Sequence, residues 1–258
     1  IEGFANLKLD CIFNAIHGTP GEDGKIQKYF KDKNIPITGC NSYQSELTFD
    51  KIACLNFLSS KGIKVASSIS LLKSEKIDIN EIENKIGFPC FIKASNSGSS
   101  FGVFKVYDKK EMVQCINSAL EVDNKVLIES FIDGREFSIG VISLKGITKV
   151  LPITEIITSN DFFDYEAKYE GKAEEITPAN ITDELESELR LLSEKIYNLL
   201  KLKGFSRSEF IVNDNGTYYL ETNTVPGLTS ESILPQQARC ADISLKELFV
   251  NAINEAII

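Results

Sequence analysis

The sequence has 258 residues, with 28 basic and 37 acidic side chains and a formal net charge of −9. Hydrophobic residues make up 43% and charged residues 25%, a globular composition that excludes a disordered or fibrous chain. The acidic balance argues against a nucleic-acid partner, because contact with phosphates requires a basic surface. At this length we expect one large domain or two of medium size.

The six cysteines form no C-x-x-C pair, and with a single histidine they argue against a Cys/His zinc site. No apolar run approaches the roughly 18 residues of a membrane span. The first ten residues carry charges where an export signal needs an apolar core. We therefore expect a cytoplasmic protein with reduced thiols and no membrane partner.

The first elements predicted along the chain are a buried strand over 9–16, a loop over 17–24 and a helix with Ile26, Tyr29 and Phe30 on one face. A short strand near 35–38 would close this βαβ-like piece. Residues 45–61 are then predicted to form one amphipathic helix that ends at Gly62.

The rest of the chain is predicted to contain short strands and helices, and its three consecutive strands between 125 and 156 look antiparallel. Predicted strands cover 67–72, 89–93, 101–106, 125–129, 136–143 and 147–156; predicted helices cover 79–86, 108–121 and 183–202. A hairpin with an Asn-Gly turn follows over 207–223, and the last helix opens with the capping box Ser244-x-x-Glu247. This order indicates an α/β and α+β protein with two facing sheets of mixed type, not one doubly wound sheet.

The segment FIKASNSGSSFGVFKV (91–106) is the first that suggests chemistry. A strand ends at Lys93, enters a Ser/Gly loop and returns through Gly102. Backbone N–H groups and hydroxyls in such a loop can close over phosphates, and a lysine at its stem adds positive charge. Taken alone, the pattern fits an ordinary hairpin turn at least as well.

Two acidic residues in the late hairpin form a second candidate site. Glu221 and Asn223 are two apart on one strand and share a face, and Glu209 on the neighbouring strand can lie across from them. Carboxylate and amide oxygens suit Mg²⁺ bound to nucleotide phosphates. The alternative, a pair of solvated surface acids, is disfavoured by the apolar residues around them.

Two further features stand out. The loop over 160–172, with Lys168 and Tyr169, is rich in aromatic and charged residues and resembles a lid over an active site, although an ordinary surface loop is an equal alternative. His17 follows a predicted strand, at a position where α/β proteins bind ligands. A structural role for His17 is at least as plausible as a catalytic one.

The order of these segments closely resembles the D-alanine–D-alanine ligases of the ATP-grasp superfamily. The resemblance runs from His17 to Ile258, and the motifs that carry it are HGTPGEDG, FIKASNSGSSFGVFKV, IESFIDGREF, FFDYEAKY and RSEFI…LETNTVPGLTSES. The resemblance implies an ATP-grasp fold with a partial N-terminal Rossmann-like domain. It also implies attack of a first D-alanine carboxylate on ATP, giving an acyl phosphate that a second D-alanine amine then attacks.

The resemblance also implies roles for individual residues. Those expected to hold ATP are Lys51, Lys93, Ser100, Glu129, Phe131, Ile132, Glu136, Phe162 and Lys168. Those expected to bind two Mg²⁺ or Mn²⁺ are Glu209, Glu221 and Asn223. Those expected at the reacting groups are His17, Ser99, Tyr169, Arg207 and the N–H of Gly227, with Ser232 and Ile233 at the second D-alanine.

The sequence departs from the family pattern at three places. Ala94 stands where the family has Pro, and Glu209 stands where it usually has Asp. The strand and Gly-rich turn that open the family's N-terminal domain are not found before Ile1, so we expect the protein to be longer than this chain. We expect three parts: residues 1–48 as the remainder of the N-terminal domain, residues 49–129 as the central subdomain, and residues 130–258 as the C-terminal subdomain.

The resemblance further implies a homodimer and a role in making peptidoglycan precursors. Two alternatives stay open: another ATP-grasp ligase that joins a carboxylate to an amine or to D-lactate, and a nucleotide-binding regulator without catalysis. A Tyr at position 169 goes with an amine as second substrate in this family.

Overall fold

The computed structural model describes residues 8–98, 101–158 and 173–257. Its helices are α1 (Lys25–Lys31), α2 (Ser42–Phe49), α3 (Lys51–Ser59), α4 (Ile79–Ile86), α5 (Lys109–Val122), α7 (Asp183–Leu199), α8 (Ile233–Cys240) and α9 (Leu245–Ile257). Its strands are β1 (Ser68–Leu72), β2 (Cys90–Ala94), β3 (Val103–Val106), β4 (Lys125–Ser130), β5 (Arg135–Leu144), β6 (Ile147–Val150), β7 (Thr154–Thr158), β8 (Ala173–Ile176), β9 (Phe205–Asn213) and β10 (Gly216–Asn223).

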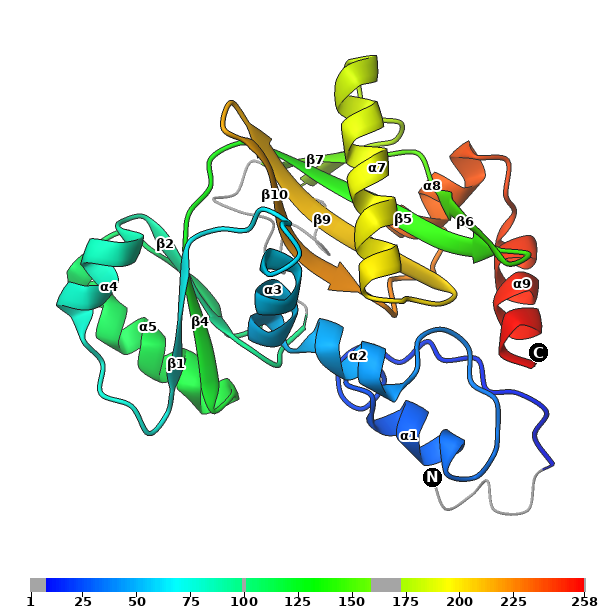
Figure 1. Ribbon diagram of the computed structural model, residues 1–258, viewed down its shortest axis with the longest axis horizontal. Coiled ribbons are helices and arrows are strands. Elements are labelled where there is room, and N and C mark those ends of the chain that lie inside the picture. Colours follow the sequence, from blue (N-terminus) through cyan, green and yellow to red (C-terminus); the bar gives the residue numbers. More distant parts are fainter. Residues whose placement is uncertain (1–7, 99–100, 159–172, 258) are drawn as a thin grey trace.

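The first sheet has four strands in the order β1-β4-β2-β3, and every neighbouring pair is antiparallel. Helices α4 and α5 cover one of its faces (Figure 1). There Ile92 and Ile128 pack against Met112 of α5 in a fully buried cluster. Because side chains alternate along a strand, Phe91 and Lys93 point from the opposite face of this sheet.

The second sheet has the order β10-β9-β5-β7-β8, with β6 also paired to β5, and its neighbouring strands are likewise antiparallel. We expected sheets of mixed type, but every pairing between the described strands is antiparallel. On β5, Phe137 and Ile139 pack toward α3 and α7, whereas Ile142 packs toward α8 and α9. The sheet therefore has helices on both faces (Figure 1).

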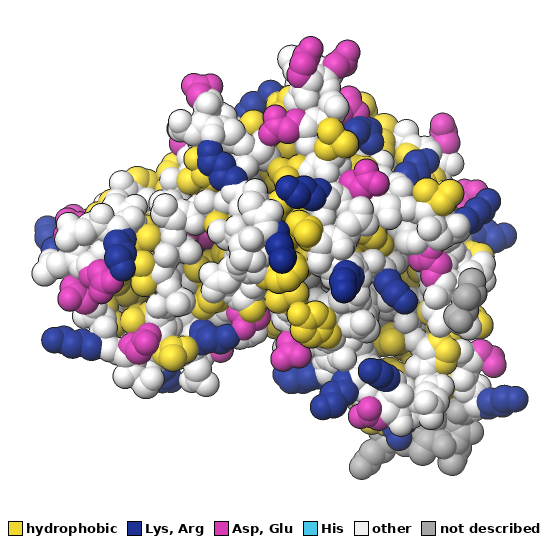
Figure 2. All heavy atoms as spheres, viewed as in Figure 1, with side chains coloured by type: hydrophobic (Ala, Val, Ile, Leu, Met, Phe, Trp, Pro, Cys, Tyr) yellow, Lys and Arg dark blue, Asp and Glu magenta, His cyan; other side chains and the backbone are white. Residues whose placement is uncertain are grey.

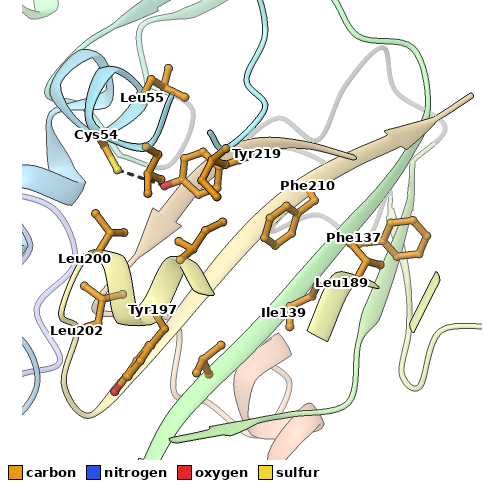
Figure 3. Close-up of a cluster of buried hydrophobic side chains, with 14 of the residues drawn as sticks. Cys54, Leu55, Phe137, Ile139, Leu189, Tyr197, Leu200, Leu202, Phe210 and Tyr219 are labelled. Atoms are coloured by element: carbon orange, nitrogen blue, oxygen red, sulfur yellow. Dashed lines mark hydrogen bonds between the residues drawn. The ribbon is translucent and has the colours of Figure 1, made fainter. Parts of the chain in front are cut away.

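One hydrophobic cluster joins α3 to the second sheet (Figure 3). Leu58 of α3 is fully buried there, and Cys54 Sγ lies 3.3 Å from the hydroxyl of Tyr219 on β10. Burying side chains of this size contributes about 1.5–3 kcal/mol each. The packing fixes α3, which begins at Lys51, against β10, which carries Glu221.

The prediction of a strand over residues 9–16 is wrong. Only Ile12 bridges to another extended segment, pairing in parallel with Ile37, and α1 lies between the two. The backbone hydrogen bonds to Pro36 and Thr38 complete this contact. The parallel order of a βαβ unit is present, but two bonds along one edge do not make a strand.

Other predicted boundaries also differ from the structure. The helix predicted over 45–61 is two helices, because Asp50 is extended (φ −79°, ψ 99°) and caps α3 through its side chain. The strand predicted over 147–156 is divided into β6 and β7 around Pro152. Strand β8 and helix α8 were not predicted. The capping box at Ser244 and Glu247 is confirmed, since each residue bonds the other's backbone N–H.

On the face in Figure 2, basic and acidic side chains both lie scattered among apolar ones. No helix within the described ranges is long and apolar enough to cross a membrane. All six cysteines lie in these ranges and are free.

Candidate active site

Two adjoining cavities lie where the two sheets meet. One has a volume of about 520 Å³ and is lined from both sheets, by β2 and β4 on one side and by β5, β9 and β10 on the other. The second, about 450 Å³, is lined by the loops after β10 and before α1 together with the ends of β9 and β10. Both volumes are typical of sites for small ligands.

The first sheet gives the larger cavity a charged pair. Lys93 Nζ forms an ion pair with Glu129, and it also lies 5.1 Å from the ring centre of Phe91. Burial acts to lower the pKa of Lys93, but Glu129, Glu221 and Glu209 outweigh it and raise that pKa. The ammonium is therefore kept charged inside the cavity, as a phosphate-binding group must be.

The second sheet gives the cavity two carboxylates on one face. Glu209 of β9 and Glu221 of β10 are register partners, because the pairing shifts by one residue between Tyr219 and Glu221. If side chains alternated strictly between the two faces of β10, Glu221 would face the core, as Tyr219 does two residues earlier. The bulge at Leu220 re-aims Glu221 toward Glu209 and the cavity.

Arg207 lines the smaller cavity and bonds Glu209, which lines the larger one. Its guanidinium donates to Ser138 Oγ at 2.9 Å and to Glu209 Oε1 at 2.5 Å. Burial would lower the pKa of Arg207, but Glu209 and Glu221 raise it, so the charge persists. A buried cation beside the second cavity can stabilise negative charge that develops there.

The second cavity brings together residues far apart in the sequence. His17 Nδ1 lies 3.6 Å from Glu22 Oε1, and this contact raises the pKa of His17. Ser232, at the start of α8, bonds Thr229. A Cβ at position 227 would lie 2.5 Å from Ser232 Oγ, so glycine there leaves room for the Ser232 side chain.

Lys51, the first residue of α3, reaches both cavities. Its Nζ donates to the carbonyl of Ser97 at 2.5 Å and lies 3.7 Å from Glu221 Oε2. Lys51 and Glu221 thus connect the larger cavity to the smaller one.

The structure places every predicted site residue that it describes in one of these cavities. The larger holds Lys51, Lys93, Glu129, Phe131, Ile132, Glu136, Glu209 and Glu221. The smaller holds His17, Lys51, Arg207, Glu221, Asn223, Gly227, Ser232 and Ile233. The predicted residues Ser99, Ser100, Phe162, Lys168 and Tyr169 lie outside the described residues.

Several lining residues were missed by the sequence reasoning. Glu22 and Gly98 both line the smaller cavity, and they lie inside quoted motifs that could have drawn attention to them. Glu175 lines the same cavity from β8, and its carboxylate accepts a bond from Gln236. Since β8 was not predicted, no signal in the sequence pointed to Glu175.

Comparison with known proteins decides which family this is. The family model "D-ala D-ala ligase C-terminus" matches residues 57–254. A D-alanine–D-alanine ligase of Flavobacterium johnsoniae is 56% identical over 247 residues, covering 96% of this chain and 76% of the relative. One from Christiangramia forsetii is 49% identical, covering 97% and 77%.

The chain belongs to the D-alanine–D-alanine ligase family.

Solved structures agree with this assignment to the ligases. The VanG D-Ala:D-Ser ligase of Enterococcus faecalis matches with a TM-score of 0.87 at 33% identity, over 98% of this chain and 74% of that one. The D-alanine–D-alanine ligase of Bacillus anthracis complexed with ATP matches with a TM-score of 0.83 at 31% identity, over 96% and 79%. The two sheets are therefore those of an ATP-grasp ligase, and the larger cavity lies where they face each other.

Proposed function

We propose that this chain joins two D-alanines into D-alanyl-D-alanine at the expense of ATP, through a D-alanyl phosphate, to supply peptidoglycan precursors. The observation that carries the proposal is the pair of adjoining cavities, connected by Lys51 and Glu221. A reaction that activates one substrate with ATP and then transfers it needs such neighbouring sites.

In the first step, a carboxylate oxygen of the first D-alanine attacks the γ-phosphorus of ATP, and the bond to the β-phosphate oxygen breaks. The products are D-alanyl phosphate and ADP. Negative charge spreads over the transferred group, so nearby cations lower the barrier. We assign that role to Lys51 and Lys93, whose ammonium groups line the larger cavity.

In the second step, the amine of the second D-alanine attacks the activated carbonyl, loses a proton, and phosphate leaves. The carbonyl oxygen becomes an oxyanion in between. Arg207 and the N–H of Gly227 line the smaller cavity and are assigned to stabilise it. Ser232 and Ile233 line the same cavity and are assigned to the second D-alanine.

Two divalent cations, Mg²⁺ or Mn²⁺, are assigned to Glu209, Glu221 and Asn223. The fit rests on the register that brings both carboxylates to one face, with Asn223 opposite Arg207 further along. Within the described ranges no group of three or more His, Cys, Asp or Glu side chains could hold a metal, so the assigned donor set is two carboxylates and an amide, with phosphate and water completing it. When bound, the metals supply positive charge to the phosphates.

The test is phosphate release from ATP by the purified protein with D-alanine, D-serine, D-lactate or L-alanine. We expect ATP-dependent release with D-alanine alone and formation of D-alanyl-D-alanine. Absence of release with D-alanine, combined with release for another pair, would replace this proposal by a ligase of different specificity. Absence of release with every substrate, with ATP still bound, would favour a non-catalytic nucleotide-binding protein.

A different second substrate is the best alternative, because one matching structure is named a D-Ala:D-Ser ligase. The higher identity to relatives named D-alanine–D-alanine ligases favours D-alanine. We further propose a cytoplasmic homodimer with units over 1–48, 49–129 and 130–258; the change of sheet between Ser130 and Arg135 supports the last boundary.

A further inference from the structure

The N-terminus of α3 is tied to the first sheet through the side chain of Asp50. Its Oδ1 accepts a bond from Ser95 Oγ at 2.7 Å and from the backbone N–H of Ala53 at 3.1 Å. Its Oδ2 pairs with Lys125 Nζ at 2.5 Å. We call Asp50, Ser95 and Lys125 the capping cluster.

The capping cluster satisfies the first turn of α3 completely. Besides the Ala53 bond, the N–H of Lys51 donates to the carbonyl of Ser95 at 3.1 Å, and that of Ile52 lies 3.4 Å from Ser95 Oγ. At some helix N-termini these N–H groups bind phosphates. Here they are already occupied, so α3 can present only the ammonium of Lys51 to a ligand.

The cluster also joins the strands that line the larger cavity. Ser95 follows directly after β2, which carries Lys93, and its N–H donates to the carbonyl of Lys125 at the start of β4. Since α3 is packed on the second sheet, Asp50 connects α3 and that sheet to the first sheet through its bonds with Ser95 and Lys125. The connection sets where Lys51 Nζ lies relative to Lys93.

We propose that Asp50, Ser95 and Lys125 are positioning residues that hold the ammonium of Lys51 at the phosphates of ATP. The inference rests on the proposed function only in taking ATP as the ligand. Bonds of Asp50 with Lys125 and Ser95 overcome its burial and lower the pKa of its carboxyl group, which keeps the charge that pairs with Lys125. None of the three residues needs to touch substrate.

The test is equilibrium binding of ATP with magnesium and without D-alanine, in variants of the whole chain. Asp50→Asn keeps a capping oxygen but removes the charge, and Lys125→Met removes its partner; each should weaken ATP binding by roughly tenfold, the scale of losing a charged hydrogen bond. Lys125→Arg should restore it. Lys85→Met, which breaks the exposed pair with Glu81 far from the site, is the matched control and should change nothing.

The deciding measurement repeats these variants with Lys51→Met. If the capping cluster acts through Lys51, adding Asp50→Asn to a chain that already carries Lys51→Met should weaken ATP binding by less than a further twofold. The reason is that the effects of two substitutions that act through the same ammonium do not add. Unchanged binding in the folded single variants overturns the inference, as does a full tenfold loss that persists without Lys51. Should Asp50→Asn not fold, Lys125→Met and Ser95→Ala carry the same comparison. ATP binding without dipeptide formation would sink the proposed function alone.

Discussion

His17 is the only histidine in the chain, so one imidazole signal reports on its environment. Its contact with Glu22 is the main cause of a raised pKa, with partial burial acting in the opposite direction. A raised pKa means that the stability gained from protonated His17 is present below its ordinary pKa and is lost as pH rises through the raised value.

The first prediction follows at this site. Glu22→Gln should lower the pKa of His17, because the replacement cannot stabilise the imidazolium by charge. An NMR titration of the single histidine checks it, with Glu111→Gln, an exposed change in the first turn of α5, as control. An unaltered pKa in Glu22→Gln would mean that the 3.6 Å contact is not an ion pair in solution.

The second prediction concerns Glu221, which faces Glu209 across the two strands. Glu221→Gln should lower turnover by about 100-fold or more, since metal charge contributes several kcal/mol and each 1.4 kcal/mol is tenfold in rate. The unfolding midpoint should hardly move. Steady-state kinetics beside thermal unfolding test this, with the exposed Glu121→Gln as control. Unimpaired turnover would remove Glu221 from the metal site.

At the scale of elements, α8 is held to the second sheet by one buried amide. Gln237 donates to the carbonyl of Ser138 at 2.7 Å and to Thr154 Oγ1 at 2.9 Å, and it accepts from the N–H of Gly140 at 2.9 Å. Gln237 has no exposed surface. Because α8 begins directly after Ser232, this amide also locates the residues assigned to the second substrate.

The third prediction is that Gln237→Ala lowers the free energy of unfolding by about 2–4 kcal/mol, since buried groups on β5 lose their partners. The KM for D-alanine should rise more than the KM for ATP, because α8 lines only the smaller cavity. Urea unfolding and kinetics measure both effects. Arg239→Gln, on the exposed side of α8, should stay within about 0.5 kcal/mol. Equal changes in both KM values would contradict the local role of α8.

Elements with strong periodic patterns or caps were predictable from the sequence, as α5, α7, α9 and the hairpin of β9 and β10 show. The segment 9–16 has the composition of a strand, but composition does not say whether a partner lies on both edges. The break between α2 and α3 depends on the Asp50 carboxylate, which caps α3. The bulge at Leu220 depends on how β9 and β10 pair, which neither strand's sequence determines alone. The site was predicted through motif order, while Glu175 required the path of β8.

At the scale of the whole molecule, the larger cavity belongs to neither sheet alone. One wall is backed by the core beneath α4 and α5, and the other by the core between the second sheet, α3 and α7. A ligand that contacts both walls binds the folded arrangement and not the unfolded chain. Its binding free energy therefore adds to the stability of the protein as a whole.

The fourth prediction is that ATP at about 100 times its dissociation constant stabilises the protein by roughly 2.7 kcal/mol. For a domain of this size that corresponds to a rise in Tm of about 5–10 °C. AMP, which keeps the α-phosphate but lacks the β- and γ-phosphates at which Lys51 and Lys93 are assigned to act, should give a much smaller rise at equal concentration. Lys93→Met should reduce the shift with ATP more than that with AMP, although the loss of the ion pair with Glu129 is common to both. Equal shifts for ATP and AMP in the unmodified chain would mean that the two lysines do not contact the β- and γ-phosphates, and that binding depends only on the part of the nucleotide that ATP and AMP share.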